Sequence, residues 1–407
     1  MGPDASAIVV GSGIVGLATA CRLAETGFRV TVLDAGGGPA EGSSRGNAGQ
    51  LLFDRVSAMG SAGFLRSLPA SMADRSQGLD IWGLGLPGRW PWSIRFLSQC
   101  TGAAWRRNTA AMLELAHLSK ASFHGFIERH PLAFDWRCPG KLIVHPTEEA
   151  LAAAARTAEF QARFGGRHVV LSSEEARARE PALQGGTRPI AGAIHLPDAE
   201  VGDCRAFCEG LAGILRERLG GRLQFGTRVE RVRHAGGRAV AVETSQGEIG
   251  ADLFVIATGR AAGTLLPRGA VVRKPIVGVR GVSLTYPAGD VAPDLSVTDA
   301  GGKFVVMRMG DRVRVSGFAS FTERLEVAPE EIALLRAKAQ ALMPEAARYD
   351  EAPEAWAGLR PQTPDDLPMI GRAGFENLFV NAGHGSLGWT FAFGSAERLL
   401  DAAGLAQ

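Results

Sequence analysis

The sequence is poor in tyrosine and contains no recognisable pattern of paired cysteines. Only two tyrosines occur in 407 residues, Tyr286 and Tyr349. The cysteines are odd in number and widely spread, which favours free thiols in a reducing compartment; they are Cys21, Cys100, Cys138, Cys204 and Cys208. Cys204 and Cys208 would share a helix face, but no pair of histidines lies near them at metal-ligand spacing. We therefore predict no disulfide framework and no metal site.

A large net charge and a long apolar run are also missing. Lys and Arg number 44 against 42 Asp and Glu, so no strong field is available to gather nucleic acid. No segment approaches the roughly 18 consecutive apolar residues of a membrane span. Residues 1–7 lead directly into an apolar segment without a basic leader. These absences predict a cytoplasmic protein that does not bind nucleic acid.

The composition is that of a globular protein with a large core. Hydrophobic residues make up 46% of the chain and charged residues 21%. At roughly 150 residues per domain, the length predicts two or three units, of which we expect two. We find no internal repeat and no low-complexity linker, which favours domains between which the chain crosses more than once.

The N-terminal segment has the pattern of a dinucleotide-binding βαβ unit. The apolar run 7–10 is followed by Gly11, Gly13 and Gly16, then by apolar residues at helical spacing as far as Gly27. A second apolar strand, 29–33, ends at Asp34. Such glycines permit a tight turn, close approach to a pyrophosphate and close packing of helix on strand, and the acid would accept hydrogen bonds from ribose hydroxyls. A chance glycine turn in another α/β protein is the alternative.

Four further motifs lie outside this unit. The polar segment 43–50 ends in Asn47-Ala-Gly-Gln50 and continues past the point where an NAD domain would begin its next helix, which favours FAD. Ala257-Thr-Gly259 closes a later strand, and Gly358-Leu-Arg-Pro361 precedes Thr363-Pro-Asp365 and Pro368. Gly383-His-Gly-Ser-Leu-Gly-Trp389 opens the last helix. Together these motifs resemble the FAD-dependent D-amino acid dehydrogenases of the glycine oxidase and D-amino acid oxidase superfamily over nearly the whole chain.

The resemblance implies how FAD is held. Residues 47–51 would lie beside the isoalloxazine ring, Val229 would present backbone groups to the adenine, and the loop 383–388 would direct N–H groups at the flavin pyrimidine edge. The predicted FAD-binding residues are Gly11, Ser12, Gly13, Ile14, Val15, Gly16, Asp34, Arg45, Asn47, Ala48, Gly49, Gln50, Leu51, Val229, Ala257, Thr258, Gly259, Gly358, Arg360, Gly383, His384, Gly385, Ser386, Leu387, Gly388 and Trp389.

Two residues are candidates for contact with the substrate. The resemblance implies that Arg360 grips a substrate carboxylate, a task that suits a planar guanidinium because it pairs with both oxygens. A surface arginine, or one tied to a structural aspartate, is the alternative. His384 would contact substrate or flavin, or else only shape the glycine loop.

The sequence departs from the family at three points. Related members attach FAD through an early His or a late Cys, but the first His here is His117 and the last Cys is Cys208, so we predict noncovalent FAD. Ser320 stands where this branch often has an acid. With only two tyrosines, the tyrosine-lined carboxylate clamp of D-amino acid oxidases does not transfer.

We therefore predict an α/β fold. It has an FAD-binding Rossmann-like domain of the glutathione reductase type (1–54, 198–264 and 355–407) and an interleaved mixed α+β substrate domain (55–197 and 265–354). Helices are expected near 105–129, 149–164, 205–219 and 330–343, and at the C-terminus. Residues 55–104 are expected to be irregular. Their aromatic stretch 82–105 would pack against the substrate domain, or else cover the active site or touch a membrane.

The predicted function is FAD-dependent oxidative deamination of a small amino acid, with a D-amino acid first. Hydride passes from Cα to flavin N5, and a quinone or another acceptor reoxidises the flavin. One alternative is the flavin subunit of a heteromeric hydroxyproline, opine or glycine dehydrogenase, which would need a partner subunit. Another is a non-catalytic nucleotide-binding scaffold. A peripheral position on the inner face of the cell membrane is a corollary of the aromatic stretch.

Overall fold

The apolar N-terminal run forms the middle of a six-stranded sheet, here called the parallel sheet. The computed structural model describes residues 5–66, 79–270 and 272–405. The strand order is β19-β20-β13-β1-β2-β9, and all neighbours are parallel except β19 and β20. Its strands are β1 (Ser6–Val10), β2 (Arg29–Leu33), β9 (Arg222–Gln224), β13 (Leu253–Ile256), β19 (Met369–Arg372) and β20 (Leu378–Ala382). The central strands read as unbroken apolar runs because both faces are covered.

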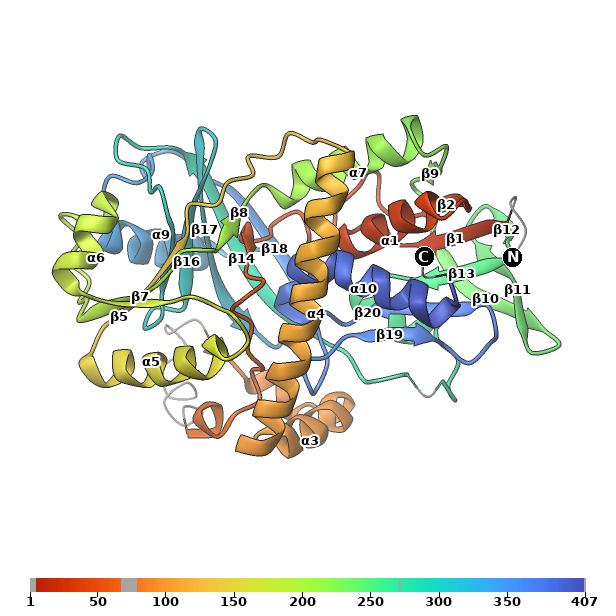
Figure 1. Cartoon of the computed structure of the whole chain (residues 1–407), viewed down its shortest axis with the longest axis horizontal. Coiled ribbons are helices and arrows are strands. Elements are labelled where there is room, and N and C mark those ends of the chain that lie inside the picture. The colour runs from red at the N-terminus through yellow and green to blue at the C-terminus, as the bar shows by residue number, and fades with distance from the viewer. Residues whose placement is uncertain (1–4, 67–78, 271, 406–407) are drawn as a thin grey trace.

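Helices cover one face of the parallel sheet, and a small sheet covers the other. The helices are α1 (Ile14–Glu25), α7 (Cys204–Glu217) and α10 (Gly388–Ala403). The opposite face carries α8 (Ala262–Leu265) and an antiparallel sheet of β10 (Val229–Ala235), β11 (Arg238–Thr244) and β12 (Gly247–Gly250). The parallel sheet and the elements that cover it form the right-hand half of the molecule in Figure 1.

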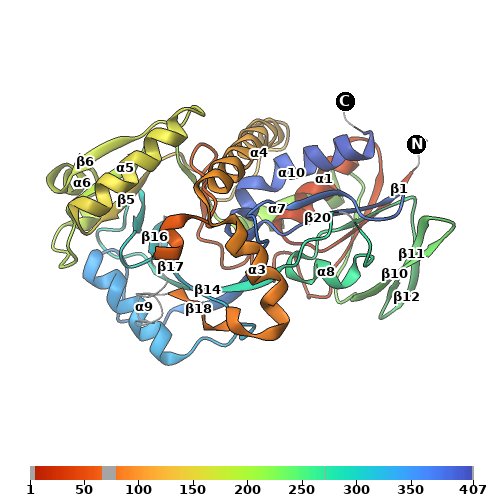
Figure 2. The ribbon, with the colours of Figure 1, turned by 90° about the horizontal axis from the view of Figure 1, so that it is seen from below.

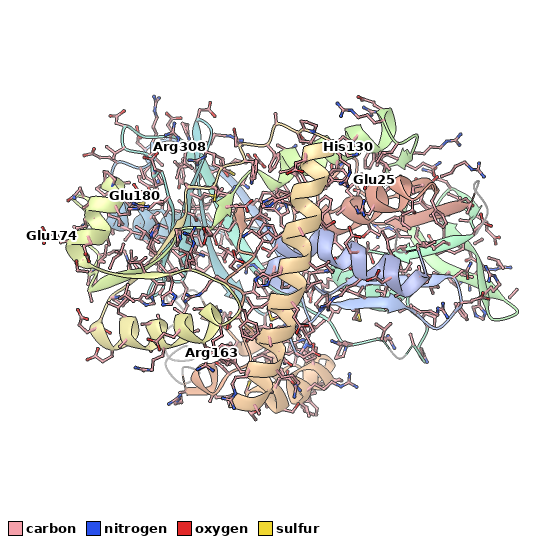
Figure 3. All side chains as sticks on the ribbon, in the orientation of Figure 1. Glu25, His130, Arg163, Glu174, Glu180 and Arg308 are labelled. Carbon is pink, nitrogen blue, oxygen red and sulfur yellow. The ribbon has the colours of Figure 1, made fainter. Side chains whose placement is uncertain are left out.

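A long helix crosses between the two halves of the molecule. It is α4 (Gly102–Arg129), which begins where the Thr101 side chain accepts a hydrogen bond from the Ala104 N–H. It packs on α10 through Phe126 and Phe393, whose ring centroids are 5.0 Å apart. At its far end, the His130 Nε2 lies 3.1 Å from the Glu25 Oε1 of α1, and both residues are labelled in Figure 3.

The other half is built on a nine-stranded sheet, here called the large sheet. Its order is β18-β14-β17-β16-β15-β5-β7-β6, with β4 added beside β17. The strands are β4 (Leu79–Asp80), β5 (Lys141–His145), β6 (Val169–Ser172), β7 (Gly192–Leu196), β14 (Val277–Pro287), β15 (Ser296–Asp299), β16 (Phe304–Met309), β17 (Arg312–Ser320) and β18 (Glu354–Gln362).

The two faces of the large sheet differ in polarity. The apolar face packs on α9 (Pro329–Leu342) and α6 (Ser173–Arg179) through a core that includes Leu284, Val297 and Val315. Alternate residues on the same strands point the other way, because side chains in a strand switch faces at each residue. This second face, here called the polar face, includes Lys141, Ser296 and Arg314. α5 (Glu148–Ala162) covers one end of it, and Figure 2 shows α5 and α9 on opposite sides of the sheet.

Most predicted helices are confirmed within a few residues, but the short helices α6 and α8 and one helix within 55–104 were not predicted. The region 55–104 was expected to be irregular, but it contains α3 (Trp90–Gln99). Pro91 lies in the first turn, where its missing N–H breaks no helical hydrogen bond. The buried side of α3, Trp92 and Phe96, packs on β14 of the large sheet. In addition, β18 pairs with β14, whereas the predicted boundary at 355 assigns it to the FAD domain.

Short elements complete the chain. A two-stranded sheet joins β3 (Gln50–Leu51) to β8 (Glu200–Val201). The 3-10 turns in the described part of the chain are η2 (Trp82–Gly85), η3 (Pro87–Arg89), η4 (Pro181–Leu183), η5 (Gly259–Ala261) and η6 (Gly385–Leu387). Within the described ranges, no helix is both long and apolar enough to cross a membrane.

Candidate active site

The turn between β1 and α1 is tightly packed around its glycines. Gly11 has φ +109°, and a Cβ on it would lie 2.6 Å from the Ala257 carbonyl oxygen. A Cβ on Gly16 would overlap the Gly11 carbonyl, so strand and helix approach closely only without side chains. Gly13 caps α1 without a side-chain hydrogen bond, and no acidic residue lies in the first turn. The N-terminus of α1 therefore remains a positive pole suited to a pyrophosphate.

Asp34 anchors this turn. Its carboxylate accepts hydrogen bonds from the Ser12 N–H at 2.6 Å, the Ser12 hydroxyl at 2.7 Å and the Gly36 N–H at 2.8 Å. The segment before Val229 reaches the same place, because the Thr227 N–H donates to the Asp34 carbonyl at 2.8 Å. A carboxylate has about four acceptor positions, so one remains for a ligand. The ribose contact of Asp34 stays a prediction.

The segment 43–51 runs across the polar face of the large sheet. Arg314 of β17 donates to the Asn47 carbonyl at 3.0 Å. The Asn47 side chain accepts from the Gly49 N–H at 2.7 Å, and Arg45 lies 4.6 Å above the Trp356 ring. Gln50 continues the path to β5, where its side chain accepts from Lys141 at 2.9 Å. These side chains hold an irregular backbone in place between the two sheets.

The loop after β20 leads into α10 and carries His384. Gly383 and Gly385 have φ values of +86° and +56°, and His384 forms an isolated bridge to Gln362 of β18. The His384 side chain is 4% exposed, and its Nε2 has no hydrogen-bond partner in the described part of the protein. Burial lowers the pKa of His384 to about 3, so the imidazole is neutral at physiological pH. α10 begins without a side-chain cap or an acid in its first turn, which leaves another positive pole.

Arg360 lies near the C-terminal end of β18, opposite Val279 of β14. One guanidinium nitrogen donates to the Phe318 carbonyl at 3.0 Å, and the group passes over Gly281, where a Cβ would overlap it. Across the described residues no carboxylate forms an ion pair with Arg360. Burial lowers its pKa from the usual value, but an arginine stays protonated. The structure thus holds a partly buried cation whose remaining N–H groups are available for a ligand.

The predicted segments converge. Gly358 lies against Ser43, and Gly259 lies against Pro361. Gln362 bridges to His384, and the Leu52 N–H donates to the Thr390 hydroxyl at 3.4 Å. The N-terminal ends of α1 and α10 are positive, the glycines of the turn between β1 and α1 allow close approach, and the His384 Nε2 is unpartnered among the described residues. These features suit a long anionic dinucleotide such as FAD. Trp389 differs from the rest, because its side chain packs in the core near Phe134 and Phe207.

Sequence reasoning missed several polar residues that surround these segments. Asp366 accepts hydrogen bonds from the Met59 N–H at 2.8 Å and from the side chain of Gln362, and burial raises the pKa of Asp366 to about 6. Trp92 donates to the Gln362 carbonyl at 2.8 Å. On β5, Lys141 was overlooked, although a lysine beginning an otherwise apolar strand was a signal in the sequence.

Comparison with known proteins agrees with this geometry. The model of a family described as FAD dependent oxidoreductase matches residues 6–402. A protein of Pseudomonas aeruginosa named D-amino acid dehydrogenase 2 is 37% identical over 404 residues, which cover 97% of this chain and 94% of that protein. A Ralstonia nicotianae protein of the same name is 36% identical, with 97% and 95% covered. A glycine oxidase structure from Bacillus cereus superposes with a TM-score of 0.74 at 20% identity, covering 98% of this chain and 94% of that one.

Proposed function

The chain belongs to the family of FAD dependent oxidoreductases, and from this premise we propose that it oxidises the Cα–N bond of a small D-amino acid. One observation carries the proposal. Arg360 is a partly buried cation without a carboxylate partner in the part of the chain described, next to the convergent FAD segments. A ligand carboxylate is the natural partner for its planar fork. The names of the curated relatives support the D configuration.

In this proposal, Arg360 binds and orients the substrate. Its guanidinium holds the α-carboxylate, so the neutral amine and the Cα hydrogen point away from β18 toward the loop 383–388. FAD, when bound, accepts the Cα hydrogen as hydride. The positive end of α10 favours negative charge developing near it. His384 is neutral and serves as a hydrogen-bonding group. The imino acid then hydrolyses to a keto acid and ammonia, or stays cyclic if the substrate is a proline.

The test is Arg360→Leu, with D- and L-amino acids screened for flavin bleaching. We expect oxidation to be crippled while the flavin spectrum stays intact, because the guanidinium binds substrate and not cofactor. Loss of a hydrogen bond to a charged group costs about 1.5 to 3 kcal/mol, or roughly ten- to a hundredfold in kcat/KM. Arg360→Lys should restore only part of the lost kcat/KM, because an ammonium cannot pair with both carboxylate oxygens as a guanidinium does. The oxidation rate of an amine substrate without a carboxylate should change little in either variant. Wild-type kinetics in Arg360→Leu would make Arg360 structural.

The electron acceptor is proposed to be a quinone or another acceptor rather than oxygen, which the dehydrogenase names of the relatives support. Turnover with a quinone or dye should exceed peroxide formation in air. Equal rates would make the protein an oxidase. A purified chain that is inactive with every amino acid and acceptor, yet carries FAD, would instead favour a subunit that needs a partner.

Membrane contact through α3 is part of the same proposal. Trp90, Ile94 and Leu97 lie at helical spacing and are 55%, 67% and 53% exposed, and Arg95 beside them is exposed too. An apolar helix face flanked by basic residues is suited to an anionic lipid surface near a membrane quinone. Trp90→Ser with Ile94→Ser should abolish flotation with anionic liposomes and leave activity with a soluble dye intact. If the double variant floats with anionic liposomes as the wild type does, the membrane contact lies outside α3.

A further inference from the structure

A buried carboxylate lies a few residues after β18, close to the loop 383–388. Asp366 is 8% exposed, and within residues 5–66, 79–270 and 272–405 no cation forms an ion pair with it. Its Oδ2 accepts from the Met59 N–H at 2.8 Å and the Gly60 N–H at 3.4 Å, and its Oδ1 accepts from the Gln362 side-chain amide. The Asp366 backbone has φ +64°, which is uncommon for a residue with a side chain. Strain of this kind gathers at functional sites.

Asp366 fixes the orientation of the Gln362 side-chain amide. The Gln362 Nε2 donates to the Asp366 Oδ1 and, at 3.4 Å, to the Thr363 carbonyl. An ionised carboxylate and a carbonyl can only accept hydrogen bonds, so the NH2 group must face both of them. The Gln362 backbone is held as well, because Trp92 of α3 donates to its carbonyl at 2.8 Å. The amide oxygen therefore has to point away from Asp366.

The amide oxygen of Gln362 lies against the loop 383–388. A Cβ on Gly385 would overlap the Gln362 Oε1, so the oxygen and the loop backbone approach closely only because this residue is glycine. A carbonyl oxygen can accept a weak hydrogen bond from a Cα–H group. An NH2 group in the same place would direct its own hydrogens at the Gly385 Cα–H groups. Turning the amide would therefore push the loop away from β18.

We propose that Asp366 and Gln362 are positioning residues for FAD: ionised Asp366 orients the Gln362 amide, and the amide oxygen holds the loop 383–388 where it contacts the flavin. When Asp366 loses its negative charge, the amide turns and the loop is displaced. This inference rests on the predicted contact between the loop and the flavin. It is independent of which substrate is oxidised, because FAD binding is measured without turnover.

The charge of Asp366 changes within a pH range that a binding experiment can reach. Burial raises the pKa of Asp366 to about 6, with a smaller contribution from Asp365, while the hydrogen bonds to Asp366 lower it. Other titratable groups that face the network are Asp365, which pairs with Lys274 at 2.8 Å, the buried Cys100 thiol at the end of α3, and His384. Comparison with a variant at position 366 isolates Asp366, because these groups are the same in both proteins.

Asp366→Asn tests the charge with almost no change in shape. Asparagine tolerates a positive φ, so the backbone gains no strain. Its amide oxygen must accept from the Met59 and Gly60 N–H groups, which turns its NH2 toward Gln362 and forces the Gln362 amide to turn as well. The full-length apoprotein is titrated with FAD, and flavin fluorescence is recorded. At about pH 7.5 the Kd of the variant should be about tenfold larger than that of the wild type.

The pH dependence separates positioning from a merely structural role. A tenfold preference of FAD for ionised Asp366 lowers the Asp366 pKa by about one unit on binding, so the wild-type Kd should rise about fivefold from about pH 7.5 to about pH 5. Asp366→Asn should lack this rise, so the two proteins approach each other at low pH. Asp365→Asn is the matched control, because it removes the neighbouring carboxylate and keeps the hydrogen bond between Asp366 and Gln362. It should retain the rise.

Gln362→Met keeps the inference testable even if Asp366→Asn does not fold. It removes the amide through which Asp366 acts, so it should weaken FAD binding and abolish the rise in Kd at low pH. In the double variant, Asp366→Asn should add little, because residues that act through one another are not additive. Melting temperatures confirm that each variant is folded. Additive effects, or a wild-type rise in Kd in either single variant, would overturn the proposal.

Gly385→Ala tests the contact on which the inference rests. Its Cβ would overlap the Gln362 Oε1, so FAD binding should weaken at least about tenfold. Unchanged affinity would show that the loop does not hold the flavin, and the proposal would fall. If no amino acid is oxidised but FAD binding responds as expected in these variants, the proposed reaction fails and the positioning role stands.

Discussion

Lys141→Met should stabilise the folded protein at neutral pH. Burial, together with the charge of Arg55, lowers the pKa of Lys141 from 10.5 to about 7. In the folded state the charged form is therefore disfavoured relative to the unfolded chain, where the lysine is fully hydrated. A methionine fills a similar volume and carries no charge.

The sign and size follow from linkage. Because the folded-state pKa is the lower one, the stability that Lys141 contributes is present above pH 10.5 and is lost as the pH falls toward 7. One pKa unit corresponds to about 1.4 kcal/mol, so the loss is on the order of 3 to 5 kcal/mol at and below neutral pH. The hydrogen bond to Gln50 offsets part of this cost.

The assay is denaturant unfolding of wild type and Lys141→Met at several pH values between about 6.5 and 10. The variant should be more stable than the wild type at the lowest pH, and this difference in the free energy of unfolding should shrink as the pH rises. The contributions of other titrating groups cancel because both proteins carry them. A gap that does not change with pH, or a wild type that is the more stable at low pH, would refute the reasoning.

Three further predictions concern the cofactor and Arg360. FAD should be released unmodified on denaturation, because no early His or late Cys is placed for linkage; flavin that stays with the precipitated chain would contradict this. Asp34→Ala should weaken FAD binding at least about tenfold, because Ser12 and Gly36 lose their common acceptor, and a fluorescence titration showing unchanged affinity would exclude an anchoring role. Gly281→Val should displace the Arg360 guanidinium and raise KM about tenfold with FAD retained, whereas an unaltered KM would show that the guanidinium does not need this space.

Local patterns in the sequence were sufficient to predict the cofactor-binding half of the molecule. A fully buried parallel strand must be apolar throughout, and a helix packed against it at close range needs glycine. The residue types at Val9, Gly11 and Gly16 were therefore enough to predict the strand and the tight turn. The helix α3 escaped prediction because Trp92 and Phe96 are buried by contacts with β14, which is distant in sequence.

The sequence by itself determined the family, the glycine turn and the residue types that hold a dinucleotide, because each of these depends on spacing within a few residues. Only the tertiary structure decided which charged groups are left without a partner among the described residues. Lys141, Arg55 and Arg360 come from separate segments, and their pairing depends on which strands the chain places side by side. A cation in a sequence carries no sign of whether an acid will neutralise it. A cation without a partner becomes visible only after the described carboxylates in reach have been assigned, and that absence of a partner is the physical basis for the proposed contact of Arg360 with the substrate.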